Sequence, residues 1–228
     1  MFSNSSTNKY SLKGEYTLVE TPFSYRNCCW FCQEPAAKVF NFPQENNNVV
    51  NCVHSPLSLN CCDECFVPAQ KSKSTSIWSV FKDVKRFLIK HYQKDLAIGI
   101  NWTQEELANS QFEEGNFEGF QRSAWFMYEV AKQRVNFKGW PLVVNGINIE
   151  ELKWEEQKSF TFDGVEYPST DDAISHYAQT FFIPVDYFKE VLVQVGLERF
   201  AYAVRFCRLL VGATPNERKA ALNNLIDD

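Results

Sequence analysis

Hydrophobic residues recur at three- and four-residue steps in several segments, and this spacing indicates helices with one buried face. The clearest stripe runs through residues 77–97, and a second stripe, rich in aromatic residues, runs through residues 117–135. A capping box at Thr103 and Glu106 predicts the start of a short helix in the intervening segment. We therefore expect helices to make up most of the fold.

β-branched and aromatic residues predict a few short strands as well. Residues 39–42 and 49–50 are expected to pair as a hairpin through the turn-like segment 44–48. An Asn-Gly turn predicts a second hairpin over residues 142–149, and an Asp-Gly turn predicts a third over residues 159–167. The expected fold class is therefore α+β and mainly helical.

The C-terminal part of the chain carries the signals of further helices. A capping box at residues 169–172 begins one helix, and Pro184 begins the next, which is expected to cover residues 185–195. The segment 197–211 is apolar on nearly all sides, which is typical of a buried helix or of a protein interface. Residues 214–217 cap a final helix.

The length of 228 residues suits one large domain or two small ones, at about 150 residues per domain. With 45% hydrophobic residues the chain can bury a core, which excludes intrinsic disorder. An acidic linker over residues 150–156 predicts a boundary near residue 155. We expect a first domain of residues 1–155 and a second domain of residues 156–228.

Charge and hydropathy narrow the choice of partners and compartment. A net charge of -5 excludes a wholly basic nucleic-acid coat protein, although it leaves room for a local basic patch. No apolar run approaches the roughly 18 residues that a membrane span needs, and the polar residues 1–10 do not resemble a secretory signal. We expect a cytoplasmic protein without a membrane partner.

The most specific signal is the spacing of the cysteines. Seven of the eight cysteines fall within residues 28–65, and they include two pairs separated by two residues, Cys29 with Cys32 and Cys62 with Cys65. Two such pairs can place four thiolates around one Zn²⁺ in a tetrahedron, at about 2.3 Å from the ion. The sequence therefore predicts a structural zinc site with these four ligands.

The neighbouring cysteines and one histidine leave alternatives for the ligand set. Cys28 and Cys61 precede the two pairs and are expected to be spare or buried, while Cys52 or His54 could replace one ligand. Cys207 lies in an apolar segment and is expected to be a small buried residue. A thioredoxin-like redox site would explain one of the two pairs and leave the other without a role.

Residues around the cysteines follow a wider pattern. They are residues 29–36, 53–56, 61–65, 91–96 and 101–107. Over about residues 25–110 this pattern resembles the zinc-bound treble-clef region of HNH-type proteins from phages and mobile elements. The resemblance implies zinc knuckles that hold a hairpin and a helix, and a histidine that supports phosphodiester cleavage with a divalent metal.

The histidine at the matching position is His54, which would act as a general base beside Mg²⁺ or Mn²⁺. The chain departs from the family's pattern at Val53, where the family has Asp, and at Phe66, where it tends to have Asn. We therefore expect a degenerate HNH-like site whose cleavage activity is lost or weak. An active endonuclease that uses His54, and a purely structural histidine, are the alternatives.

The only strongly basic stretch follows the second cysteine pair. Between residues 71 and 94 a single acidic residue, Asp83, stands against seven basic ones. These candidate phosphate-binding residues are Lys71, Lys73, Lys82, Lys85, Arg86, Lys90 and Lys94. The alternatives are a solvated helix face without a partner and a face covered by the acidic segment 104–118.

The C-terminal segments are similar to a second family. Residues 163–169, 172–173, 177, 183–184 and 196–197 follow the pattern of the small NUMOD-like helix-turn-helix module found beside homing and phage nucleases. The resemblance covers about residues 160–202 and implies a second helix that contacts DNA. Within residues 185–195 the only basic residue is Lys189, so a helical hairpin that packs on something else is an equal alternative.

Three functions follow from these patterns. The first is a zinc-stabilised protein that binds nucleic acid or takes part in assembly and has a degenerate HNH-like site. The second is an active HNH-type endonuclease that uses a divalent metal. The third is an adaptor that binds protein through its C-terminal helices and makes no contact with nucleic acid.

Overall fold

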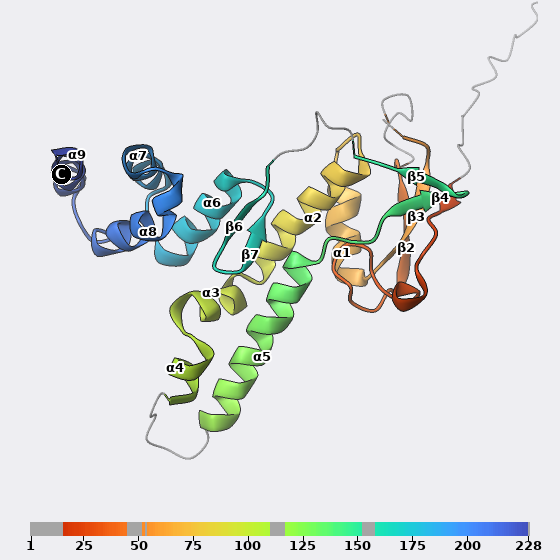
Figure 1. Ribbon diagram of the computed structural model, residues 1–228, viewed down its shortest axis with the longest axis horizontal. Helices are drawn as coiled ribbons and strands as arrows, with labels where there is room; N and C mark the ends of the chain where they lie inside the picture. The colour runs from red at the N-terminus through yellow and green to blue at the C-terminus, as the bar shows by residue number, and fades with distance from the viewer. Residues whose placement is uncertain (1–15, 45–51, 53, 110–116, 152–157, 228) are drawn as a thin grey trace, which may run out of the picture. The chain divides into compact units, whose positions relative to one another are not determined.

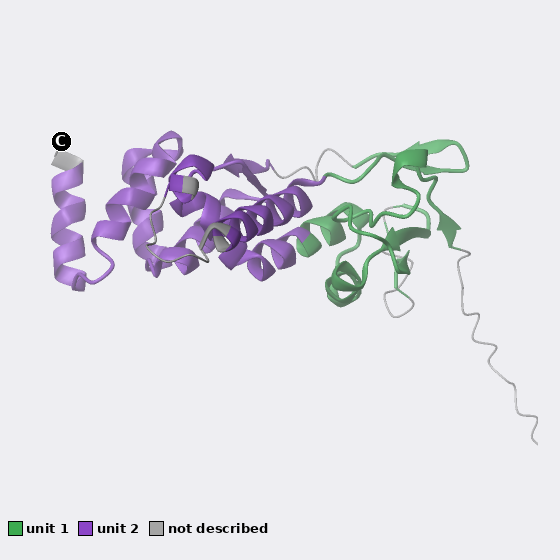
Figure 2. Cartoon of the chain, turned by 90° about the horizontal axis from the view of Figure 1, so that it is seen from below, with its two compact units in different colours: residues 1–84, 138–155 green, residues 85–137, 156–228 purple. Residues whose placement is uncertain are grey.

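The computed structural model describes residues 16–44, 52, 54–109, 117–151 and 158–227 (Figure 1). The fold class is α+β and mainly helical, as predicted. The chain divides into two compact units (Figure 2). The N-terminal unit comprises residues 1–84 and 138–155, and the C-terminal unit comprises residues 85–137 and 156–228.

The N-terminal unit is built on a three-stranded sheet and the helices that follow it. Its elements are β1 (Thr17–Leu18), η1 (Phe23–Tyr25), β2 (Lys38–Phe42), β3 (Leu57–Cys61), α1 (Asp63–Lys71), the first half of α2 (Ile77–His91), β4 (Leu142–Val144) and β5 (Ile147–Ile149). The strand order is β1-β3-β2, with β3 parallel to β1 and antiparallel to β2.

The strand predicted over residues 39–42 is confirmed, but its partner is a different segment. β2 pairs with β3, so that Phe42 lies opposite Leu57 and Lys38 lies opposite Cys61. The expected partner strand, residues 49–50, lies outside the described residues. β3 is buried at four of its five positions and is the central strand of the sheet, with a neighbour on each side.

Aromatic and aliphatic side chains from the sheet and α2 form the core of the N-terminal unit. Phe31 and Phe40 are fully buried, and their rings are 5.9 Å apart. The ring of Trp30 packs edge-on against Phe81 of α2 at 5.1 Å. Its Nε1 donates a hydrogen bond to the carbonyl oxygen of Trp140 at 2.9 Å. Residues 138–155 are thereby joined to the N-terminal unit, although they are distant from it in sequence.

The C-terminal unit is helical apart from one short hairpin. Its elements are the second half of α2, α3 (Gln93–Asn101), α4 (Gln104–Asn109), α5 (Phe117–Asn136), β6 (Phe160–Phe162), β7 (Val165–Tyr167), α6 (Thr170–Phe181), α7 (Val185–Val195), η3 (Leu197–Arg199), α8 (Phe200–Leu209) and α9 (Pro215–Asp227). The rings of Tyr177, Phe188 and Phe200 meet at its centre and are all buried.

The single helix predicted over residues 77–97 is wrong, because α2 ends at His91 and α3 begins at Gln93. Tyr92 stands between them with φ -92° and ψ 16°, outside the helical region. Tyr92 and Leu96 are both buried and continue the hydrophobic stripe across the break. The periodicity therefore could not reveal where the first helix ends.

The two units differ from the predicted domains in the segment 85–137, which groups with the C-terminal part of the chain. Asn136 at the end of α5 explains part of this grouping. Its Nδ2 donates to the carbonyl oxygen of Gly164 at 2.6 Å, and its Oδ1 accepts from the backbone N–H of Glu166 at 2.9 Å. α5 is thus attached to the β6–β7 hairpin.

None of the helices in the described part of the chain combines the length and the apolar character that a membrane crossing requires.

Candidate metal centre

Cys29 and Cys32 lie in a tight turn that precedes β2. The backbone N–H of Cys29 donates to the carbonyl oxygen of Glu34 at 2.7 Å, and the N–H of Gln33 donates to the carbonyl oxygen of Cys29 at 2.9 Å. Gln33 adopts a left-handed conformation with φ 68°, which reverses the chain directly after the second cysteine. The turn therefore directs both sulfur atoms to the same side. We call residues 27–36 the knuckle.

Cys62 and Cys65 lie where β3 passes into α1. Cys62 is the N-cap of α1, and its Sγ accepts a hydrogen bond from the backbone N–H of Cys65 at 3.4 Å. The N-terminus of a helix carries partial positive charge, and this charge stabilises thiolates placed there. The second pair is therefore held at a helix start whose partial charge would stabilise its thiolates once a metal is bound.

The two pairs converge in the interior of the N-terminal unit. The sulfur atoms of Cys29, Cys32, Cys62 and Cys65 all lie within 4.8 Å of one another, and all four residues are buried. The Sγ atoms of Cys32 and Cys62 are 3.6 Å apart. Four sulfur atoms at zinc-binding distance in a tetrahedron are separated by about 3.8 Å. The four predicted ligands therefore lie close enough together to bind one metal ion such as zinc.

Hydrogen bonds among the sulfur atoms shift their pKa values in opposite directions. The thiol of Cys29, followed by those of Cys62 and Cys65, hydrogen-bonds to Cys32 and lowers its pKa. The hydrogen bond to Cys32, with burial adding to it, raises the pKa of Cys29 to about 12. Hydrogen bonds to Cys29 likewise raise the pKa values of Cys62 and Cys65. Metal binding by all four thiolates must therefore release protons.

The remaining cysteines lie outside the group of four, although the side chain of Cys61 hydrogen-bonds to that of Cys29. Cys61 is buried, and its thiol donates to the carbonyl oxygen of Cys62 at 3.3 Å. Cys28 and Cys52 are half-buried, and burial raises the pKa of Cys52. Cys207 belongs to the C-terminal unit and is buried, as predicted, which raises its pKa to about 12. Among the described residues, the metal-binding group consists of the four cysteines alone.

Comparison with known proteins does not assign the chain to a family. No family model, curated protein or solved structure matches it. The chemistry of the centre therefore rests on its four sulfur atoms and on the backbone that holds them.

His54, the predicted catalytic residue, is held at the start of α2. Its Nε2 accepts a hydrogen bond from the backbone N–H of Ile77 at 3.1 Å, so its Nδ1 carries the proton and donates to the carbonyl oxygen of Ser55 at 3.0 Å. Its ring lies between those of Phe42 and Trp78, at 5.2 and 5.4 Å. Both nitrogens are thus used within the N-terminal unit. The catalytic role of His54 stays a prediction.

The basic residues of the N-terminal unit divide into two kinds. Lys71 and Lys73 are exposed at and just after the end of α1, and neither has an ion-pair partner among the described residues. Lys82 forms an ion pair with Glu151 at 2.7 Å, with only 19% of its side chain exposed. Two of the three predicted phosphate ligands in this unit therefore remain available to an anion.

The predicted phosphate-binding residues of the C-terminal unit also divide into residues with a partner and exposed residues. Lys85 is buried, and its Nζ donates to the carbonyl oxygen of Arg134 at 2.8 Å. Arg86 forms an ion pair with Asp172 at 3.0 Å. Lys90 and Lys94 are exposed. Glu151 and Asp172, which pair with Lys82 and Arg86, both lie outside the acidic segment 104–118 that was the alternative cover for the basic stretch.

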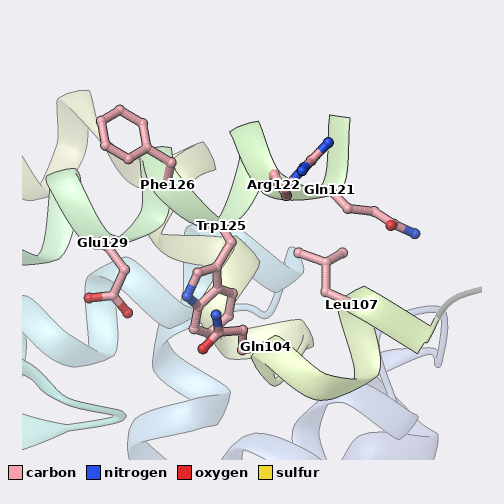
Figure 3. Close-up of a pocket in the computed structure, with 7 residues that line it drawn as sticks. All are labelled: Gln104, Leu107, Gln121, Arg122, Trp125, Phe126 and Glu129. Atoms are coloured by element: carbon pink, nitrogen blue, oxygen red, sulfur yellow. The ribbon is translucent and has the colours of Figure 1, made fainter. Parts of the chain in front are cut away.

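Two further features of the C-terminal unit bear on binding. Lys189, the only basic residue of α7, forms an ion pair with Asp171 of α6 at 2.7 Å. A cavity of about 670 Å³ lies between α4 and α5 (Figure 3). Leu107 of α4 and Trp125 of α5 point toward it. Glu129 is the one candidate metal ligand or nucleophile among the described residues that line this cavity.

Proposed function

We propose that the protein is a zinc-stabilised nucleic-acid-binding protein whose N-terminal unit is an HNH-like treble clef without cleavage activity. The observation that carries this proposal is the cluster of four buried cysteine sulfur atoms. The order of knuckle, β2–β3 hairpin and α1 supports the treble-clef assignment, because the first two ligands come from the knuckle and the last two from the start of the helix.

The donor set favours zinc in a structural role. Four thiolates in a tetrahedral arrangement suit Zn²⁺, and four protein ligands leave no coordination position for water or substrate. Such an ion contributes on the order of 10 kcal/mol to folding in small zinc domains. The zinc would hold the knuckle, the hairpin and α1 together, and it would take no part in a reaction.

The exposed lysines support a nucleic-acid partner. Lys71 ends α1 and Lys73 lies just after it, in the unit that the zinc would organise, and Lys90 and Lys94 are exposed in the C-terminal unit. Cations of this kind bind phosphates without reading the base sequence. The hydrogen bonds at both nitrogens of His54 favour binding without cleavage.

Metal analysis of the purified chain tests the zinc site. We expect one zinc per chain by mass spectrometry of the metal, and cobalt substitution should give the absorption bands of a tetrahedral thiolate site. Cys65→Ser should lower the zinc content, whereas Cys207→Ser, a buried cysteine of the C-terminal unit, should leave it unchanged. A zinc-free protein with a folded N-terminal unit would overturn the proposal.

A salt titration tests the nucleic-acid partner. Binding of DNA and RNA oligonucleotides should weaken linearly on a logarithmic plot against salt concentration, because each contacted phosphate releases counterions. The double substitution of Lys71 and Lys73 by Ala should reduce that slope. A protein that binds neither DNA nor RNA even at low salt would contradict the proposal.

An adaptor function is the second candidate, and exposed apolar residues in the C-terminal unit favour it. Phe182 is 82% exposed, Val193 is 79% exposed and Leu209 is 86% exposed. Apolar side chains of this kind mark a protein-binding surface where they adjoin in one patch. Failure to bind any nucleic acid, with the fold and zinc content intact, would leave this candidate as the better one.

A further inference from the structure

A small groove lies on the N-terminal unit beside the knuckle. It has a volume of about 290 Å³. Its polar lining consists of the side chains of Arg26, Asn27, Lys38 and Asn60, together with the backbone at the start of β2. Pockets for small molecules generally enclose about 300–1,000 Å³, so this groove suits one part of a larger ligand better than a whole small molecule.

The walls of the groove are held by the knuckle. The backbone N–H of Ala36 donates to the carbonyl oxygen of Asn27 at 2.8 Å, and the N–H of Trp30 donates to that of Asn60 at 2.9 Å. The Nδ2 of Asn60 donates in turn to the carbonyl oxygen of Arg26 at 3.1 Å. The same turn carries two of the four cysteines, so a metal ion at the centre would also fix the shape of the groove.

The charge of the groove is positive. Its lining residues, all within the described chain, include two cations and no carboxylate. Arg26 is exposed and has no ion-pair partner among the described residues. Lys38 contacts Asp63 at 2.8 Å, with 44% and 70% of the two side chains exposed. Exposed pairs of this kind contribute only about 0–1 kcal/mol, so an incoming anion can replace Asp63.

An exposed aromatic ring adjoins the groove through Arg26. The guanidinium carbon of Arg26 lies 4.4 Å from the centre of the Phe23 ring. Phe23 is 79% exposed, so most of its ring is open to solvent. Proteins that bind single strands combine a cationic track for the phosphates with aromatic rings on which unpaired bases stack. Arg26 and Phe23 offer this combination in one place.

We propose that this groove binds a phosphate of single-stranded nucleic acid and that Phe23 stacks on an adjacent base. Arg26 and Lys38 hold the phosphate, and the amides of Asn27 and Asn60 supply further donors. A duplex keeps its bases stacked on one another, so it cannot offer a free base to Phe23. The assignment rests on the proposed nucleic-acid function and specifies its substrate class.

Fluorescence anisotropy with the full-length zinc-bound protein tests the groove. The ligands are a short oligothymidine, a short oligouridine and a mixed-sequence DNA duplex. We expect Arg26→Ala and Lys38→Ala each to weaken single-strand binding and to reduce the salt slope by about 1. Phe23→Ala should weaken single-strand binding about 10-fold and leave the salt slope unchanged, because stacking releases no counterions.

Two controls separate the groove from the rest of the molecule. Lys158→Ala removes an exposed lysine of the C-terminal unit and should leave binding unchanged. Zinc content and circular dichroism show whether each groove variant is still folded. Wild-type affinity in the folded variants of Arg26, Lys38 and Phe23 would overturn the groove while the nucleic-acid function stands.

Two other outcomes also decide the matter. Duplex binding as tight as single-strand binding would overturn the single-strand assignment. Absence of binding by the wild-type protein, at low salt and to all three ligands, would overturn both the groove and the proposed function.

Discussion

At the scale of single residues, two side chains support the start of α2. The Oγ of Ser76 accepts a hydrogen bond from the backbone N–H of Ser79 at 3.2 Å, and the Nε2 of His54 accepts from that of Ile77 at 3.1 Å. The first N–H groups of a helix have no hydrogen-bond partner within the helix. Each of these contacts therefore supplies a partner to an N–H group that would otherwise be left without a hydrogen bond.

We predict that His54→Ala lowers the free energy of unfolding by about 1 kcal/mol, as the loss of a helix cap does. Ser76→Ala should have an effect of similar size, and urea denaturation measures both. Neither the wild-type protein nor His54→Ala should nick plasmid DNA in Mg²⁺ or Mn²⁺. Nicking by the wild-type protein that disappears in His54→Ala, at unchanged zinc content, would show instead that His54 is catalytic.

The buried His176 of α6 should lower the free energy of unfolding in acid. It is 4% exposed, its Nε2 has no hydrogen-bond partner among the described residues, and burial lowers its pKa from 6.5 to about 4. Between these values the unfolded chain binds the proton and the folded chain does not. The stability is therefore unaffected above pH 6.5 and falls as the pH drops toward 4, by about 2 kcal/mol at pH 5.

Nuclear magnetic resonance of the histidine side chains checks this prediction. The His176 ring should titrate with a midpoint near pH 4, as burial lowers its pKa from 6.5 to about 4. His176→Phe should remove part of the acid sensitivity of unfolding. A midpoint near 6.5 in the folded protein would contradict the buried, neutral state of this side chain.

The residue-scale features that could be predicted from sequence are those made by neighbours in the chain. The boxes that begin at Thr103, Ser169 and Thr214 all form hydrogen bonds with the residue three positions later. The cap at Ile77 could not be predicted, because it comes from His54, 23 residues away. The role proposed for Arg26 could not be predicted from sequence, because Arg26 and Lys38 are brought into one groove only by the fold.

At the scale of elements, α3 and α5 approach closely at a glycine. A Cβ added at Gly99 would overlap the ring of Tyr128, which is buried. We predict that Gly99→Ala destabilises the C-terminal unit by about 1–3 kcal/mol, since one of the two helices must move.

Gly119 of α5 provides the matched control for this substitution. Among the described residues no atom lies within 4 Å of a Cβ at that position, so Gly119→Ala should stabilise the helix by about 0.5–1 kcal/mol. Thermal unfolding followed by circular dichroism measures both changes. Equal midpoints for the two variants would show that the two helices do not pack closely at Gly99.

Helices and hairpins could be predicted from sequence where residues close together in the chain specify them. The Asn-Gly and Asp-Gly turns produce the hairpins β4–β5 and β6–β7, with positive φ at both turn residues, and α7 covers residues 185–195 as expected. The partner of β2 was not predictable in this way. β3 begins 15 residues after β2 ends, which is farther along the chain than a short hairpin turn reaches.

At the scale of the whole molecule, the chain crosses between its two units more than once. Lys82 and Glu151 pair within the N-terminal unit over 69 residues of sequence, and Arg86 and Asp172 pair within the C-terminal unit over 86 residues. The boundary predicted from composition near residue 155 matches one of the points where the chain passes from one unit to the other. The other two points, after residues 84 and 137, depend on contacts between residues distant in sequence, which composition does not reveal.

The division into units predicts how the protein responds to metal removal. All four candidate ligands belong to the N-terminal unit, whereas the C-terminal unit has an aromatic core of its own. A chelator should therefore unfold the N-terminal unit and leave α5 to α8 in place. Hydrogen exchange measured by mass spectrometry should show loss of protection in β2, β3 and α1, with protection retained around Tyr177 and Phe200.

Cys65→Ser should produce the same exchange pattern without a chelator. Cys207→Ser should leave the protection of the N-terminal unit unchanged. Acid should release the metal as well, because protons compete for the four thiolates. Loss of protection in both units at the same chelator concentration would mean that they unfold as one. In that case the zinc site would stabilise the entire chain, and the C-terminal core would be insufficient by itself.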